Sequence, residues 1–81
     1  MVQNHHSTNK VLLVVYKEIK SGASHISFDF DEEADTLYIS FEKPQNATDT
    51  DILEDGTFLR IRDDKIVGIT ITNFSQKYQH A

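Results

Sequence analysis

Residues 28–41 read FDFDEEADTLYISF, and this sequence predicts a β-hairpin. Apolar residues alternate with other residues on both sides of an acidic break, namely Phe28, Phe30, Leu37, Ile39 and Phe41. Because successive side chains of a strand point to opposite faces, these five residues are expected to share one face of a sheet. Asp31 and Asp35 can accept hydrogen bonds from nearby backbone N–H groups, so the acidic segment between them is expected to form the turn.

The rest of the sequence extends this pattern. Pro44 would end the second strand because it has no N–H to donate to the ladder. Part of the segment around Thr48 is expected to form a short edge strand, and clearer strands are expected at 57–62 and 66–72. Gly56 favours a turn between the edge strand and the first of these. Gly68 would mark either a bulge or a close approach of another backbone.

The segment before the hairpin has two readings. Val11, Val14 and Val15 favour a strand by β-branching. Other apolar residues fall at helical spacing, namely Leu12, Val15, Tyr16 and Ile19. We expect a helix over about 10–20 in which this second set covers one face of the sheet.

Signals at both ends of this segment support the helix. Ser7 or Thr8 could cap its start. Lys17 and Lys20 would lie near its carboxyl end, where the helix dipole favours cations, and Gly22 is placed to end it.

The predicted fold is therefore α+β, a small antiparallel β-meander of four to five strands with one N-terminal helix packed on one face. An 81-residue chain supports one domain. We place that domain at 10–75, with the sheet at about 25–74, between a flexible N-terminal tail at 1–9 and a polar C-terminal tail at 76–81.

Charge and composition exclude several classes of function. Thirteen acidic residues against eight Lys and Arg give a net charge of −5, which argues against nucleic-acid binding. The absence of cysteine excludes disulfides and thiol chemistry. Residues 1–10 do not read as a signal peptide, and the longest apolar run, 11–16, is too short to span a bilayer. We expect a cytoplasmic protein without membrane partners.

Chain length also bears on assembly. A chain of this size buries about 63% of its unfolded surface, and the gain from burial nearly cancels the cost of ordering the chain. A second subunit would add stability, so we expect a homo-oligomer, most simply a two-fold dimer. The acidic charge would favour a basic protein partner, and Tyr38, Phe58 and Phe74 are aromatic candidates for contact.

The acidic hairpin turn is the one group of residues that could carry chemistry. Its members are Asp29, Asp31, Glu32, Glu33 and Asp35. Such carboxylates could offer oxygen ligands to calcium or magnesium, but their order differs from that of an EF-hand loop. Paired carboxylates can also act as acid and base in a concave pocket, which an interface between subunits near His25 or Tyr38 could supply.

A solvated turn is the simpler reading of the acidic cluster. We therefore assign no catalytic, metal or cofactor-binding residue, and keep the acidic cluster with Tyr38 as candidates for an interface. A non-catalytic interaction or oligomerisation module is the favoured function. A small enzyme or cation-binding protein is the alternative.

Residues 30–39 read FDEEADTLYI and resemble the Tyr-Asp-x-Glu-Ala-Asp-x-Leu-Tyr-Ile motif of a small bacterial family, domain of unknown function 2283. Asp55-Gly56 and the segment 66–71 are similar to later elements of that family, so the resemblance covers roughly 25–75. Phe30 stands where tyrosine is usual. The resemblance implies no catalytic residue. Because some members are thought to be encoded beside toxin-like partners, it suggests an antitoxin-like or partner-binding role.

Overall fold

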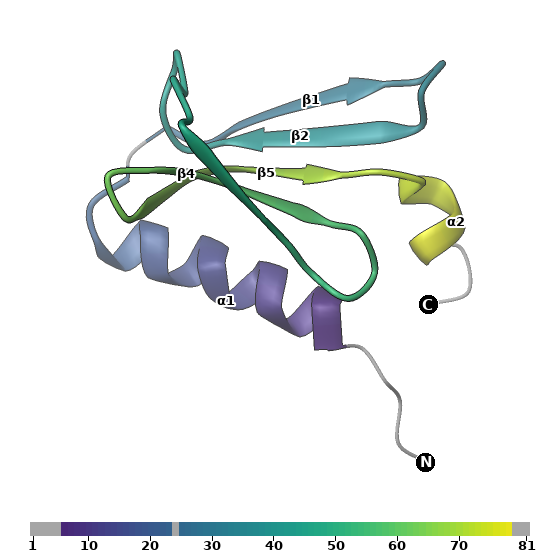
Figure 1. Cartoon of the computed structure of the whole chain (residues 1–81), viewed down its shortest axis with the longest axis horizontal. Coiled ribbons are helices and arrows are strands. Elements are labelled where there is room, and N and C mark those ends of the chain that lie inside the picture. Colours follow the sequence, from purple (N-terminus) through teal and green to yellow (C-terminus); the bar gives the residue numbers. More distant parts are fainter. Residues whose placement is uncertain (1–5, 24, 79–81) are drawn as a thin grey trace.

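The computed structural model describes residues 6–23 and 25–78. Helix α1 precedes a five-stranded antiparallel sheet, and a short helix α2 follows it (Figure 1). The bounds are α1 His6–Lys20, β1 Ser27–Asp31, β2 Thr36–Ser40, β3 Asp49–Ile52, β4 Phe58–Arg62, β5 Lys65–Ile71 and α2 Phe74–Tyr78. The predicted α+β class is confirmed, including the edge strand expected near Thr48.

The order of the strands in the sheet is β1-β2-β5-β4-β3. The hairpins β1–β2, β3–β4 and β4–β5 pair as neighbours, as expected for strands joined by short turns. Strand β5 also pairs with β2, which separates β2 from β3. The segment 41–48 therefore crosses from the middle of the sheet to its far edge. The connection between β2 and β3 is therefore the one that departs from a meander, in which strands adjacent in sequence are also neighbours in the sheet.

Helix α1 begins at His6, so Ser7 and Thr8 lie within the helix and neither is its N-cap residue. The helix ends as expected, because Gly22 has a φ of 101°. The Gly22 N–H donates to the Ile19 carbonyl at 3.1 Å, and the Ala23 N–H donates to the Glu18 carbonyl at 3.0 Å. These two bonds form the Schellman arrangement that glycine favours at this position.

The stripe of α1 that packs on the sheet differs from the expected one. Val11 and Val14 are buried and Val15 is half-buried, whereas Leu12, Tyr16 and Ile19 are exposed. The valines that argued for a strand are thus the core residues of a helix. Both sets of apolar residues recur at helical spacing, and the set of three valines faces the sheet.

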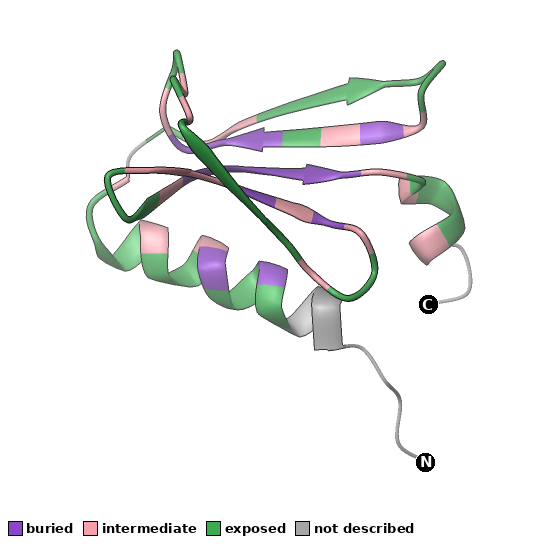
Figure 2. Ribbon diagram, viewed as in Figure 1, coloured by how far each residue is buried: buried purple, intermediate pink, exposed green. Residues whose placement is uncertain are grey.

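The core lies between α1 and one face of the sheet (Figure 2). Ile39, Ile69 and Leu59 are paired across β2, β5 and β4 and form its central row. The remaining buried members are Val11, Val14, Phe41 and Ile71. The inward positions predicted for Leu37, Ile39 and Phe41 are confirmed, since Leu37 is half-buried against this cluster.

Both predicted tails fall partly outside the described residues. Positions 1–5 and 79–81 lie outside them. Residues 6–9 belong to α1, and 76–78 belong to α2. Phe74 and Tyr78 of α2 pack against the core, with their ring centroids 5.2 Å apart. The C-terminal segment therefore closes one end of the core.

Candidate interaction surface

The edge strand β1 exposes two phenylalanines on the helix side of the sheet. Phe28 pairs with Ile39 and Phe30 with Leu37, so both share the face on which α1 packs. Phe28 is nevertheless 61% exposed and Phe30 51% exposed. Helix α1 therefore leaves this edge of the sheet uncovered.

The outward flank of α1 is apolar as well. Leu12, Tyr16 and Ile19 are each more than half exposed. With about 3.6 residues per turn, they form one stripe along the helix. The opposite flank carries Leu13 and Lys17, which line a shallow groove of about 320 Å³ against the β4–β5 turn. The apolar stripe is thus turned away from that turn.

We call Leu12, Tyr16, Ile19, Phe28 and Phe30 the helix-side apolar surface. Isolated exposed apolar residues are ordinary on soluble proteins, but a grouping of large ones on one side marks a candidate binding surface. Of these five residues, Phe30 alone has a ring contact within the described part of the chain, an edge-to-face contact with Phe74 at 5.8 Å between centroids. The surface combines residues of the helix α1 with residues of the edge strand β1.

The aspartates at both ends of the acidic hairpin turn accept hydrogen bonds. The Ala34 N–H donates to Asp31 Oδ1 at 3.2 Å, which is the local turn bond expected from the sequence. Asp35 has a φ of 52° and accepts from Ser75 instead, with the Ser75 hydroxyl 2.9 Å from Oδ2 and the Ser75 N–H 3.1 Å from Oδ1. Asp35 therefore holds the first turn of α2.

The other acidic candidates are at the surface. Glu32 and Glu33 are exposed, and Asp29 forms an ion pair with Lys43 at 3.4 Å in which both side chains are about 60% exposed. Across the residues that the structure describes, no three His, Cys, Asp or Glu side chains gather in a way that could hold a metal ion. The acids are spread along the hairpin and do not converge.

Tyr38 lies on the other face of the sheet, as predicted, and is 39% exposed. It heads a cross-strand row that continues through Thr70, Phe58 and Ile52. Thr70 is buried within this row and Ile52 is exposed. Tyr38 is therefore separated by the sheet from the exposed phenylalanines of β1.

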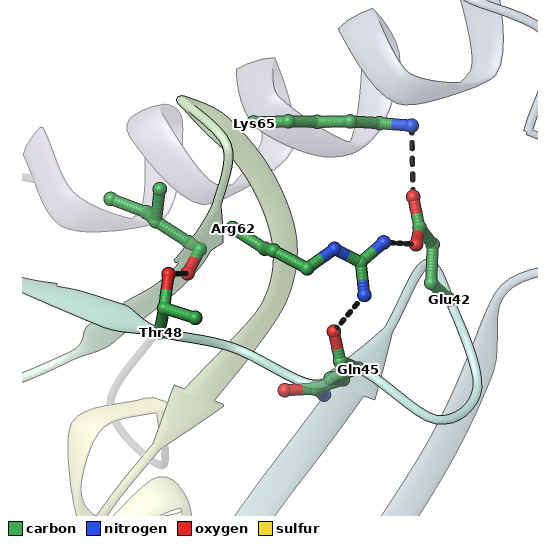
Figure 3. A network of polar contacts seen from close by, with 6 residues as sticks. Glu42, Gln45, Thr48, Arg62 and Lys65 are labelled. Atoms are coloured by element: carbon green, nitrogen blue, oxygen red, sulfur yellow. Dashed lines mark hydrogen bonds and ion pairs between the residues drawn. The ribbon is translucent and has the colours of Figure 1, made fainter.

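A polar network that the sequence reading missed holds the crossover (Figure 3). Glu42 accepts from Lys65 Nζ at 2.8 Å and from Arg62 Nη2, while Arg62 Nη1 donates to the Gln45 carbonyl at 2.6 Å. The hydrogen bonds from Lys65 and then Arg62 lower the pKa of Glu42 below its usual value of 4.5. The same contact with Glu42 raises the pKa of Lys65.

The crossover is attached to β4 and β2 by further bonds. The Thr48 N–H donates to the Ile61 carbonyl at 2.8 Å, and Gln45 Nε2 donates to Ser40 Oγ at 2.8 Å. Glu42 is distant in sequence from Arg62 and Lys65 and the three show no motif, so only the strand order β2-β5-β4 reveals that they meet. This network is structural: it fixes the segment that carries the chain across the sheet.

A family model described as "Protein of unknown function (DUF2283)" matches residues 27–75, which is more than half of the chain. The chain belongs to the DUF2283 family. No curated protein and no solved structure matched the sequence. The family assignment agrees with the resemblance seen in the hairpin motif.

The DUF2283 region begins at the first residue of β1 and ends in α2. It contains the whole sheet, Phe28 and Phe30, and the bond between Asp35 and Ser75. Helix α1 lies outside it. The helix-side apolar surface thus combines a stripe from the preceding helix with the edge strand of the DUF2283 region. In the described residues, no helix is long and apolar enough to cross a membrane.

Proposed function

We propose that this DUF2283 protein is a non-catalytic protein-interaction module that associates through the helix-side apolar surface. The observation that carries the proposal is the exposure of large apolar side chains on α1 and on the helix-side face of the edge strand β1. Water contact of such groups is unfavourable, and association would remove it.

The extent of the surface supports this role. Its five side chains expose on the order of 600 Å² per copy, against about 800 Å² per partner in a standard protein interface. Aromatic residues are also enriched in interfaces, and three of the five are Phe or Tyr. Adding the polar rim that every interface carries would bring the contact to the usual size.

The acidic hairpin turn contributes to recognition in this proposal. Glu32 and Glu33 are exposed at the end of β1, beside the phenylalanines in sequence. Charges at the rim of an interface steer encounter and exclude wrong partners more than they add affinity. The partner-binding, antitoxin-like role that the family resemblance suggests is compatible with such a surface.

The test compares two polar substitutions of matched chemistry. Leu12→Ser with Tyr16→Ser changes two of the three residues of the apolar stripe, whereas Ile52→Ser changes a similarly exposed residue of β3 on the other face. We expect the first variant to lose self-association in light scattering and to lose captured proteins in pull-downs, while Ile52→Ser behaves as the wild type. Unchanged association and unchanged capture in the double variant would refute the proposal.

A further inference from the structure

We infer that strand β1 pairs with strand β1 of a second copy of this chain, antiparallel about a two-fold axis that passes through Phe28. The sheets of the two copies would join along this contact, which we call the β1 seam. The inference rests on the proposed function, because Phe28 and Phe30 belong to the helix-side apolar surface, and it names the partner of that part of the surface.

The hydrogen bonds of β2 define the direction in which its backbone groups point. The Phe41 N–H donates to the Val67 carbonyl at 3.0 Å, which continues the antiparallel ladder between β2 and β5 by one residue. In such a ladder, hydrogen-bonded pairs alternate with pairs that are not bonded. Ile39 therefore bonds to β5, as Phe41 does, and Tyr38 between them bonds to β1.

The same alternation leaves Phe28 and Phe30 with backbone groups that point out of the sheet. Tyr38 pairs with Asp29, so the N–H and C=O of Asp29 point toward β2. Those of Phe28 and Phe30 point to the open side of β1, which is an edge of the sheet (Figure 1). Among the described residues, no backbone group bonds to them on that side. An edge of this kind is a template for another strand.

The two edges of the sheet differ in what they would bring together. On the helix-side face, β3 presents Asp49 and Asp51, whereas β1 presents the exposed rings of Phe28 and Phe30. Pairing of β3 with its own copy would set carboxylates side by side, which is unfavourable. Pairing of β1 with its own copy would instead cover apolar rings. The edge at β1 is therefore the one suited to association.

Charge on the other face of β1 selects the register. A two-fold axis through Asp29 would place this residue opposite the partner's Asp29, and an axis through Phe30 would place it opposite the partner's Asp31. Both registers oppose like charges directly across the strands, which is destabilising. An axis through Phe28 places Asp29 opposite the partner's Ser27. In that register no aspartate of β1 faces another.

In this register β1 is complementary to itself, which argues for a second copy as the occupant. On the helix-side face Phe28 lies opposite the partner's Phe28, and Phe30 lies opposite the partner's Ile26, so apolar side chains meet apolar ones. Every contact away from the axis occurs twice, as in any isologous interface. The strand that fits the open edge of β1 is thus β1.

The experiment places charges at position 28, which the axis sets opposite itself. A dimer of the Phe28→Lys chain would face lysine with lysine, and a dimer of the Phe28→Glu chain would face glutamate with glutamate. An equimolar mixture would face lysine with glutamate. We expect the mixed dimer to have a dissociation constant about tenfold lower than that of either variant alone. Sedimentation velocity over a concentration series measures all three constants.

The matched control makes the same substitutions at Phe30. Phe30→Lys and Phe30→Glu have the same net charges as the variants at position 28, and Phe30 is similarly exposed. Because position 30 lies opposite the partner's Ile26 in the β1 seam, mixing the control variants should bring no gain. A gain on mixing at Phe30 and not at Phe28 would overturn the register.

Amide exchange of the wild-type chain tests the seam directly. The amides of Phe28 and Phe30 should exchange rapidly in dilute solution and slowly in the dimer, while the Asp29 amide, bonded to β2, stays slow throughout. Protection of both amides, together with the gain at position 28 alone, would support the inference.

The opposite outcomes separate this inference from the proposed function. A wild-type chain that stays monomeric at all concentrations would overturn the second copy as occupant, while capture with Leu12→Ser and Tyr16→Ser would still test the surface. A dimer in which the amides of Phe28 and Phe30 remain unprotected would overturn the β1 seam and leave the proposed function standing.

Discussion

The Gln45 side chain lies directly over Gly68. A Cβ at position 68 would stand 2.5 Å from Gln45 Cδ, and Gln45 Nε2 is held in place by its bond to Ser40 Oγ, whose residue pairs with Gly68 across β2 and β5. Gly68 therefore borders a bulge, as one of the two sequence readings predicted, but the group that approaches it closely is a side chain and not another backbone. Its neighbour in β4, Arg60, borders the register shift, and a side chain crosses above it.

We expect Gly68→Ala to lower the free energy of unfolding by about 1 kcal/mol, since Gln45 must move and its hydrogen bond to Ser40 is lost. Urea unfolding measures the change. In a Gln45→Ala background the same substitution should be neutral or stabilising, because the space is open and alanine restricts the unfolded chain more than glycine does. Equal costs in both backgrounds would contradict the assigned contact.

The long-range bond from Asp35 to Ser75 predicts a graded series. Asp35→Ala removes the acceptor for the Ser75 N–H and hydroxyl, and should cost about 1 kcal/mol, the usual value for loss of a capping side chain. Asp35→Asn should cost less, because asparagine tolerates a positive φ and keeps one acceptor oxygen. Amide exchange at Ser75 should accelerate in the same order, while exchange in β5 stays slow. Identical exchange in all three chains would exclude the cap.

The depressed pKa of Glu42 predicts a pH-dependent contribution to stability. Because the pKa is lower in the folded state, the stabilisation is fully present above the unfolded pKa near 4.5 and is lost as the pH falls through the folded pKa. Glu42→Gln should therefore be less stable than wild type at pH 7, and the two unfolding curves should converge below pH 4.5. A difference that persists unchanged at low pH would mean that ionisation of Glu42 is irrelevant.

The hydrogen bonds within the hairpin turn predict weak interaction with divalent cations. Asp31 Oδ1 accepts from Ala34 and both carboxylate oxygens of Asp35 accept from Ser75, so neither group is free to turn toward an ion. Calcium needs several converging oxygens. Titration calorimetry at millimolar calcium should give no saturable heat. A saturable signal that disappears in Glu32→Gln with Glu33→Gln would revive the cation-binding alternative.

The sequence predicted the local parts of this fold well, because they depend on neighbours in the chain. Alternation at Phe28, Phe30, Leu37 and Ile39 gave the hairpin its faces, and Gly22 ended the helix through a motif that spans six residues. Each of these features is written in a short window, where periodicity and turn chemistry are strongest.

What the sequence did not predict depends on pairing between distant segments. The insertion of β5 between β2 and β4 follows from no local pattern, and the meeting of Glu42 with Arg62 and Lys65 follows from that insertion. In α1 both apolar stripes have helical spacing, so only the packed structure shows that Val11 and Val14 face the sheet. The exposure of Phe28 likewise follows from the packed structure, because α1 does not cover β1.

The position of β5 imposes an order on assembly. Two hairpins, β1–β2 and β3–β4, hold their own ladders, but no ladder joins one to the other except through the strand made last. During synthesis the two hairpins cannot join into one sheet until β5 has been made and pairs between β2 and β4. A chain ending before Lys65 should accordingly form no common sheet, because a two-stranded hairpin is only marginally stable by itself.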